Sequence, residues 1–461
     1  MLKWSAIIVV LALIIILGCK GGGTPVIPPD GNSHAAITGP YDDPREVTAQ
    51  CLECHGDVAA DIMQTSHWTW VSGEVTLPGG SAPEPYGKIN SINNFCISVP
   101  SNWGRCTQCH IGYGWNSPEF DFSDEMNLDC LICHDTTGTY RKAKTTAGLP
   151  EESVDLEYVA QNVGTPSRAN CGACHFNGGG GNAVKHGDLD QSMVNPSASI
   201  DIHMGGADML CQDCHVTRDH DIGGRLPWLN DYISLDVECT SCHSETPHES
   251  ARLNWHYLSV SCQTCHIPLY AYEDPTVMHW DWSTAGLPAA PDDREWDQKK
   301  GSFVKATDVV PEYFWFNGTM DSYLPGDEMD PAGETDLNYP LGDIDDPGAK
   351  IWPFKVHRGY QPYDTSYNIF LIPKLFGPGG FWATFNWDPA FQLGAEDAGI
   401  PYSGNYGFAD SAMYWPITHM VQSTENALQC GACHTGEDPG LLDWEAMGYE
   451  GDPTIFGSRW D

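Results

Sequence analysis

Basic residues are scarce in this chain. Its 461 residues include 22 Lys and Arg against 62 Asp and Glu, which gives a formal net charge of −40. This charge argues against a nucleic-acid partner, because the phosphate backbone would repel the protein. Charged residues are nevertheless only 18% of the chain and aromatic residues reach 11%, so the composition is not that of an unfolded acidic tail.

Long apolar runs are also missing, except at the start. Residues 4–17 are apolar, follow Lys3 and end in Gly18 and Cys19. This pattern is typical of a bacterial lipoprotein signal peptide at 1–18, with Cys19 as the acylated residue, although an uncleaved N-terminal anchor remains an alternative. Residues 19–45 are rich in Gly and Pro and indicate a flexible tether. We therefore expect an exported protein held at the outer membrane only by its lipid anchor, on a face that the sequence does not specify.

A long regular repeat is absent, but the short pattern CxxCH occurs eight times. Two thiols at this spacing bind the two vinyl groups of a haem as thioethers, and the adjacent His reaches the iron. Zinc ribbons or redox dithiols would leave the regular His unexplained. The pattern predicts eight covalently bound haem c groups, attached at Cys51, Cys54, Cys106, Cys109, Cys130, Cys133, Cys171, Cys174, Cys211, Cys214, Cys239, Cys242, Cys262, Cys265, Cys430 and Cys433.

The motifs divide the chain unevenly. Their spacing varies from 23 to 168 residues, which argues against a repeat array. We expect a seven-haem core at 46–289, a haem-free aromatic, Gly- and Pro-rich segment at 290–425 that packs on it as coil, and the eighth haem site with a tail at 426–461. The expected fold class is mainly α with extensive coil and little β, with short helices at the attachment sites and a core packed with haem.

Histidines outside the motifs are candidates for the second axial position. The first ligands are His55, His110, His134, His175, His215, His243, His266 and His434, and the candidate distal ligands are His67, His186, His203, His220, His248, His256, His279, His357 and His419. We expect His34 to be free in the tether. His220 and His248 each lie five residues after a motif His and should serve a neighbouring haem. The count allows seven bis-His haems with one open iron, or eight closed ones; only an open iron can bind substrate.

Two further features break the pattern. Arg141, Lys142 and Lys144 cluster after the third motif, although Lys is scarce. A neutral Lys amine there could bind iron or a bound anion, or the cluster could neutralise haem propionates. Cys96 is the only cysteine apart from Cys19 that lies outside a motif. It is either a small buried hydrophobe or a thiolate that attacks a sulfur–sulfur bond.

Several stretches between the motifs resemble the octahaem tetrathionate reductase family of c-type cytochromes. They extend over residues 48–435 and include 65–70 (TSHWTW), 93–98 (NNFCIS), 106–115 (CTQCHIGYGW), 129–140 (DCLICHDTTGTY), 184–190 (VKHGDLD), 355–364 (KVHRGYQPYD) and 415–421 (WPITHMV).

The resemblance implies seven bis-His haems and a second haem, held by Cys106 and Cys109, that carries a Lys ligand and a substrate face. Lys142 is the expected ligand and Lys144 the fallback. Cys96 and Asn93 would lie in the pocket. Independently of the resemblance, we expect Arg141, Lys142 and Lys144 to offset charge that builds on the substrate during reduction. His110 would bind opposite the Lys or be displaced.

The predicted function is the reduction of tetrathionate, nitrite or hydroxylamine, with electrons from redox-partner cytochromes or quinol-linked donors. The alternative is a non-catalytic surface conduit to extracellular acceptors, with every haem six-coordinate and self-association into filaments possible. In either case, the acidic charge favours a basic redox partner.

Overall fold

The structure is a computed structural model and describes residues 33–71, 73–80, 82–224, 237–436 and 440–460. The expected signal peptide, Cys19 and most of the tether lie outside these residues. The helices are short: α1 (Pro44–Cys54), α2 (Val58–Ile62), α3 (Ser66–Thr69), α4 (Trp103–Cys106), α5 (Leu131–His134), α6 (Leu156–Gln161), α7 (Arg168–His175), α8 (Cys211–Cys214), α9 (Ala251–His256), α10 (Cys262–His266), α11 (Phe381–Thr384), α12 (Trp387–Ala398), α13 (Cys430–Cys433) and α14 (Pro453–Phe456).

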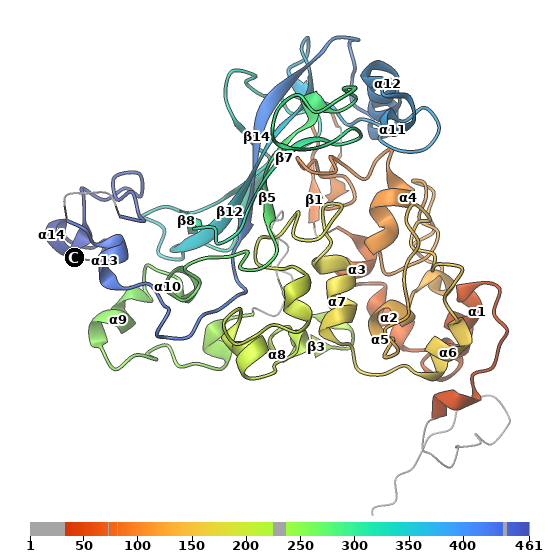
Figure 1. Cartoon of the computed structure of the whole chain (residues 1–461), viewed down its shortest axis with the longest axis horizontal. Coiled ribbons are helices and arrows are strands. Elements are labelled where there is room, and N and C mark those ends of the chain that lie inside the picture. The colour runs from red at the N-terminus through yellow and green to blue at the C-terminus, as the bar shows by residue number, and fades with distance from the viewer. Residues whose placement is uncertain (1–32, 72, 81, 225–236, 437–439, 461) are drawn as a thin grey trace, which may run out of the picture.

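Most helices lie in one layer, and a sheet rises from it (Figure 1). The strands are β1 (Gly73–Val75), β2 (Glu84–Tyr86), β3 (Thr217–Arg218), β4 (Asp221–Ile222), β5 (Thr276–Asp281), β6 (Glu295–Asp297), β7 (Gly301–Ala306), β8 (Glu312–Phe316), β9 (Met320–Ser322), β10 (Thr335–Asp336), β11 (Asn338–Pro340), β12 (Lys350–Asp364), β13 (Ile369–Phe370) and β14 (Tyr406–Pro416). The predicted class, mainly helix and coil, is confirmed.

Local sequence explains where the haem-site helices begin. Asp43 caps α1 in a capping box with Glu46, and Pro44 occupies the first turn. Ser167 and Ser261 cap α7 and α10 through their hydroxyl groups. These caps satisfy backbone N–H groups that have no partner inside the helix, so even short helices hold a CxxCH motif in a defined turn.

The segment 290–425 differs from the expected coil. It supplies most of an eight-stranded sheet with the order β10-β14-β12-β5-β7-β6, to which β8 and β13 add by pairing with β12. The strand β12 is antiparallel to β14 and parallel to β5. Because β12 is buried along most of both faces, its sequence lacks the polar–apolar alternation of a half-buried strand. Its prolines also weaken a strand prediction.

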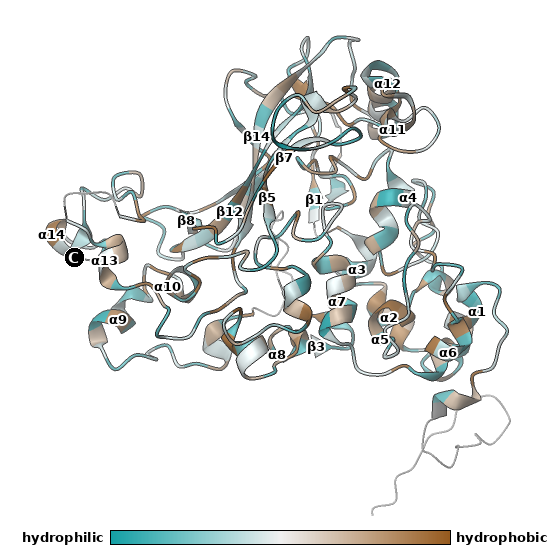
Figure 2. Ribbon diagram, viewed as in Figure 1, coloured by the Kyte–Doolittle hydropathy of each residue, from teal (hydrophilic) through white to brown (hydrophobic). Residues whose placement is uncertain are grey.

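The largest apolar cluster packs between this sheet and α11 and α12, and includes Trp282, Phe381, Phe391 and Trp415. The helical layer has smaller clusters, such as the one around Leu131 and Val159. Figure 2 shows hydrophilic and hydrophobic residues interspersed along the longer helices. In the described residues, no helix is long and apolar enough to cross a membrane.

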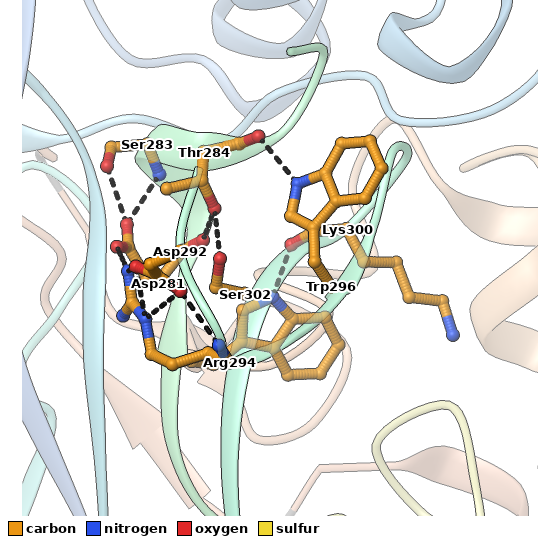
Figure 3. A network of polar contacts seen from close by, with 9 residues as sticks. Asp281, Ser283, Thr284, Asp292, Arg294, Trp296, Lys300 and Ser302 are labelled. Carbon is orange, nitrogen blue, oxygen red and sulfur yellow. Dashed lines mark hydrogen bonds and ion pairs between the residues drawn. The ribbon is translucent and has the colours of Figure 1, made fainter. Parts of the chain in front are cut away.

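A polar network fixes the end of β5 to the β6–β7 hairpin (Figure 3). Arg294 forms ion pairs with Asp281 and Asp292, at 3.0 and 2.8 Å. The Trp280 indole donates to the carbonyl of Lys300 over 2.7 Å. The Lys300 side chain points away from the network (Figure 3).

Candidate haem sites and the second haem pocket

Each CxxCH motif lies on a short helical turn. Six motifs begin in α1, α4, α7, α8, α10 and α13, the third begins at Cys130, the N-cap residue of α5, and the sixth begins in a 3-10 turn at Cys239–Ser241. The haems are numbered 1 to 8 in the chain order of their motifs. A helical turn places the two Cys and the adjacent His of a motif near one another, as covalent haem attachment requires.

Seven of the motif histidines face a second imidazole. The ring centroids lie 6.1–6.4 Å apart in the pairs His34–His55, His67–His175, His134–His220, His203–His243, His215–His419, His248–His266 and His256–His434. Two imidazoles that bind one metal from opposite sides, each over about 2 Å, hold their centroids roughly 6 Å apart. The paired residues therefore fit bis-His haems 1 and 3 to 8.

The pairing differs from the expectation at the N-terminus. We expected His34 to be free, but it stacks on His55 of the first motif. The mistake came from treating the whole of 19–45 as a tether on composition alone. His220 and His248 face His134 and His266, each in a motif other than the one that precedes it, which is the arrangement expected for neighbouring haems.

Three expected distal ligands are placed elsewhere. His186 packs against Trp415, His357 stacks on Phe95, and His279 lies on β5. In the described structure none of these three faces a motif histidine. His357 is fully buried and neither of its ring nitrogens has a hydrogen-bond partner in the protein.

Several ligand imidazoles are oriented by hydrogen bonds from Nδ1. The acceptor is a backbone carbonyl for His134, His215 and His256, at Gly164, Gly223 and Arg252. It is the Asn254 amide oxygen for His248, and a carboxylate for His419 (Asp188) and His434 (Asp452). With Nδ1 engaged in this way, Nε2 is left to bind the iron.

The attachment sites adjoin one another. Motif thiols, which stand for the thioether sulfurs of the attached haems, lie side by side in the pairs Cys51–Cys130, Cys109–Cys174, Cys171–Cys211 and Cys239–Cys262. Further pairs of motif sulfurs lie near one another: Cys133–Cys171, Cys214–Cys242 and Cys265–Cys433. Together these contacts connect the sites in the order 1–3–4–5–6–7–8, with site 2 joined to site 4. Such a continuous series suits electron transfer.

The second motif is the exception. His110 is fully buried, its Nε2 donates to the Trp68 carbonyl over 2.7 Å, and its Nδ1 has no partner. Burial lowers its pKa to about 3, so the ring is neutral. It is surrounded by the rings of Trp68, Trp70, Trp115, Phe120 and Phe122 at 4.9–6.1 Å. No other imidazole in the described residues faces it. Of the two arrangements considered for His110, this geometry matches displacement.

Lys142, the expected iron ligand, is already engaged. Its Nζ lies 3.0 Å from the Asp129 carboxylate and donates to the carbonyls of His110 and Gly112. The Asp129 side chain is fully buried and the Lys142 side chain is 6% exposed, so this is a buried ion pair. Arg141 and Lys144 are exposed on the surface. Of the three, only Lys142 contacts the second motif, and it contacts the backbone there.

Lys185 was not among the candidates, yet it lies at the same site. It is half-buried, its Nζ lies 4.7 Å from the ring centroid of Trp415, and it lies near Cys109 of the second motif. Burial lowers its pKa to about 7. Lys355 on β12 holds the backbone of this loop, because its Nζ donates to the carbonyls of Val184 and Lys185. The signal available in the sequence was a lysine inside VKHGDLD, in a chain with little lysine.

Cys96 lies near Cys106 of the second motif, on a loop that also contains Asn93. The Asn93 Oδ1 accepts hydrogen bonds from the backbone of residues 95, 96 and 97, at 2.8–3.2 Å, and so shapes the loop. The Cys96 Sγ donates to the Gly179 carbonyl over 3.2 Å. Burial raises its pKa, although Lys300, Arg105 and Lys88 act in the opposite direction. Cys96 is therefore a thiol at neutral pH, and the thiolate alternative is not supported.

Eight CxxCH motifs, seven of which have a motif histidine that faces a second imidazole, define a multihaem c-type cytochrome. A family model for bacterial cytochrome c matches residues 277–437. Among solved structures, octahaem cytochrome c from Shewanella oneidensis is 47% identical, with a TM-score of 0.84, and the match covers 92% of this chain and 98% of that chain. No curated protein matches. The chain belongs to the octahaem c-type cytochromes, and its cofactors are eight covalently bound haem c groups.

Proposed function

We propose that this octahaem cytochrome is a reductase that gathers electrons through its bis-His haems and delivers them to a small inorganic substrate at haem 2. The observation that carries this proposal is the position of His110. Seven motif histidines face a second imidazole, whereas His110 lies in an aromatic cage and bonds to Trp68. A haem without bis-His ligation can keep an exchangeable face for substrate.

Lys185 is our candidate for the amine at haem 2, in place of Lys142. The lowered pKa makes the neutral amine accessible near pH 7, and only a neutral amine has a lone pair for iron. The Lys142 Nζ, by contrast, is held by the Asp129 carboxylate at 3.0 Å. When bound, haem 2 supplies the electrons and a Lewis-acidic iron.

The charges around Cys96 support an anionic substrate. Lys88, Arg105 and Lys300 all lower the pKa of the Cys96 thiol, so three cations act on this pocket in a chain with few cations. They would offset negative charge that develops as nitrite or tetrathionate is reduced. Because Cys96 holds its proton, we assign it a hydrogen-bonding role toward substrate, and not nucleophilic attack on a sulfur–sulfur bond. Hydroxylamine, a smaller neutral molecule, belongs to the same set of substrates.

The proposed setting is outside the cytoplasm, where covalent haem attachment occurs. The CxxCH motifs and the expected signal peptide support export, and Cys19 supports a lipid anchor at the outer membrane. Redox-partner cytochromes or quinol-linked donors would supply electrons. The acidic surface favours donors of basic charge.

Electron paramagnetic resonance of the oxidised holoprotein tests the proposal. We expect one ferric signal that nitrite alters, together with low-spin bis-His signals that nitrite leaves unchanged. If no signal responds to nitrite, all eight irons are closed and the protein is an electron conduit instead, acting alone or as a filament. Sulfate, which does not bind ferric haem appreciably, serves as the control anion.

A further inference from the structure

Two of the haem-ligand imidazoles donate to a buried carboxylate. The His419 Nδ1 donates to the Asp188 carboxylate over 3.1 Å, and the His434 Nδ1 donates to Asp452 over 2.7 Å. Both carboxylates are nearly inaccessible, at 1% and 3% side-chain exposure. The other imidazole hydrogen bonds described above end on uncharged oxygens.

Both carboxylates are held firmly. Asp188 also accepts the backbone N–H groups of Thr418 and His419, at 2.8 and 2.9 Å. Asp452 caps α14 and accepts from the backbone and the hydroxyl of Thr454. Neither carboxylate can therefore turn away from its imidazole without breaking local structure.

The partner imidazoles of the same two haems are hydrogen-bonded as well. His215, opposite His419, donates to the Gly223 carbonyl over 2.7 Å. His256, opposite His434, donates to the Arg252 carbonyl over 2.9 Å. Haems 5 and 8 thus have both imidazoles polarised, one of them by a full negative charge.

We propose that Asp188 and Asp452 set haems 5 and 8 to lower reduction potentials than the other bis-His haems. A carboxylate that accepts from Nδ1–H increases the electron donation of the imidazole and stabilises the ferric state. Haem 8 lies at the end of the connected series of attachment sites and haem 5 lies in its middle. Haems 5 and 8 therefore have lower reduction potentials than their neighbours in the series. Electron transfer from haem 8 to haem 7 is then thermodynamically favourable. The inference concerns electron transfer and holds whether or not haem 2 reduces a substrate.

The test is a spectroelectrochemical titration of the holoprotein and its variants, with haem content checked for each. We expect Asp452→Asn and Asp188→Asn each to raise the midpoint potential of one low-potential component. Asp443→Asn and Asp213→Asn are the matched controls. Asp443 lies near the eighth motif and Asp213 lies in the fifth. Each control removes an exposed carboxylate that does not contact an imidazole, so the midpoint potential should shift much less.

A second variant, which leaves Asp452 in place, tests the proposal even if an Asn variant loses haem. Thr454 is exposed, and its hydroxyl donates to the same Asp452 oxygen that accepts from His434. Thr454→Ala removes that competing donor, so the potential of the same component should fall. Asn variants that keep all their haem and titrate as the wild type, controls that shift as much, or an unchanged Thr454→Ala protein would each overturn the proposal.

Discussion

Two lysines near the second motif have different chemical surroundings. Lys142 is neutralised by Asp129, and Asp129 also accepts hydrogen bonds from the hydroxyl groups of Tyr113 and Tyr140. Lys185 lies over an aromatic ring and has a lowered pKa. The first environment holds the Lys142 amine in a contact with a carboxylate, and the second favours a Lys185 amine that can lose its proton. The position of a lysine relative to a CxxCH motif in the sequence could not distinguish these two environments, because the burial and the partners of a side chain arise only on folding.

We expect Lys185→Met to abolish the nitrite-responsive signal or change its spin state, and to lower reductase turnover by about 100-fold or more. The bis-His signals and the haem content should stay intact. Electron paramagnetic resonance and steady-state kinetics provide the measurements.

The matched variant for that experiment is Lys142→Met. It leaves the buried Asp129 carboxylate unpaired, which typically costs about 3–5 kcal/mol, so the melting temperature should fall. Its nitrite-responsive signal should remain in the folded fraction. The reverse result, in which Lys142→Met alters the signal and Lys185→Met does not, would assign the ligand to Lys142.

At the scale of elements, β12 connects the eight-stranded sheet to the layer of short helices that carries the CxxCH motifs. Lys355 on this strand is fully buried, and besides the two loop carbonyls its Nζ donates to the Thr276 hydroxyl over 2.6 Å. Burial lowers its pKa to about 7. The folded protein thus favours the neutral amine, whereas the unfolded chain holds the proton up to its ordinary pKa of about 10.4. Stability from this group is lowest below pH 7 and increases from pH 7 to about 10.

We expect Lys355→Met to destabilise the holoprotein by about 1–3 kcal/mol at pH 9.5, because buried acceptors lose their donor. The loss should shrink toward pH 6.5, where the wild type holds a buried charge. Melting temperatures of both proteins across this range measure the effect. Lys374→Met, in the same segment but at a lysine that is only half-buried, is the control. A difference in melting temperature that is constant with pH would contradict the argument.

The sequence predicted the parts of the molecule that depend on local chemistry. Each CxxCH motif is complete within five residues, so all eight attachment sites and their short helices were predictable. The partner of each imidazole depends on contacts between distant segments, as His215 with His419 shows. That is why His34 was missed and His357 was wrongly included among the candidates that face a motif histidine. The strand β12 was missed because its buried Lys355, His357 and Gln361 obscure the pattern of a strand.

At the scale of the whole molecule, charge governs encounters with partners. With a formal net charge of −40, long-range attraction should speed association with a basic donor cytochrome. We expect the rate of electron transfer from such a donor to fall about tenfold or more between 20 mM and 200 mM salt, because added ions screen the attraction. Stopped-flow reduction measures this rate. An uncharged reductant should show little salt dependence, and equal salt dependence of both would refute the argument.

The stacking of His34 on His55 changes the meaning of the N-terminal segment. His34 lies ten residues before the first residue of α1, in the stretch that connects the proposed lipid anchor to the body. We therefore expect this segment also to supply the second axial ligand of the first haem. Cleavage between His34 and α1 would then remove that ligand and leave all eight attachment motifs, so a shortened form of the protein for biochemical work has to begin upstream of residue 34.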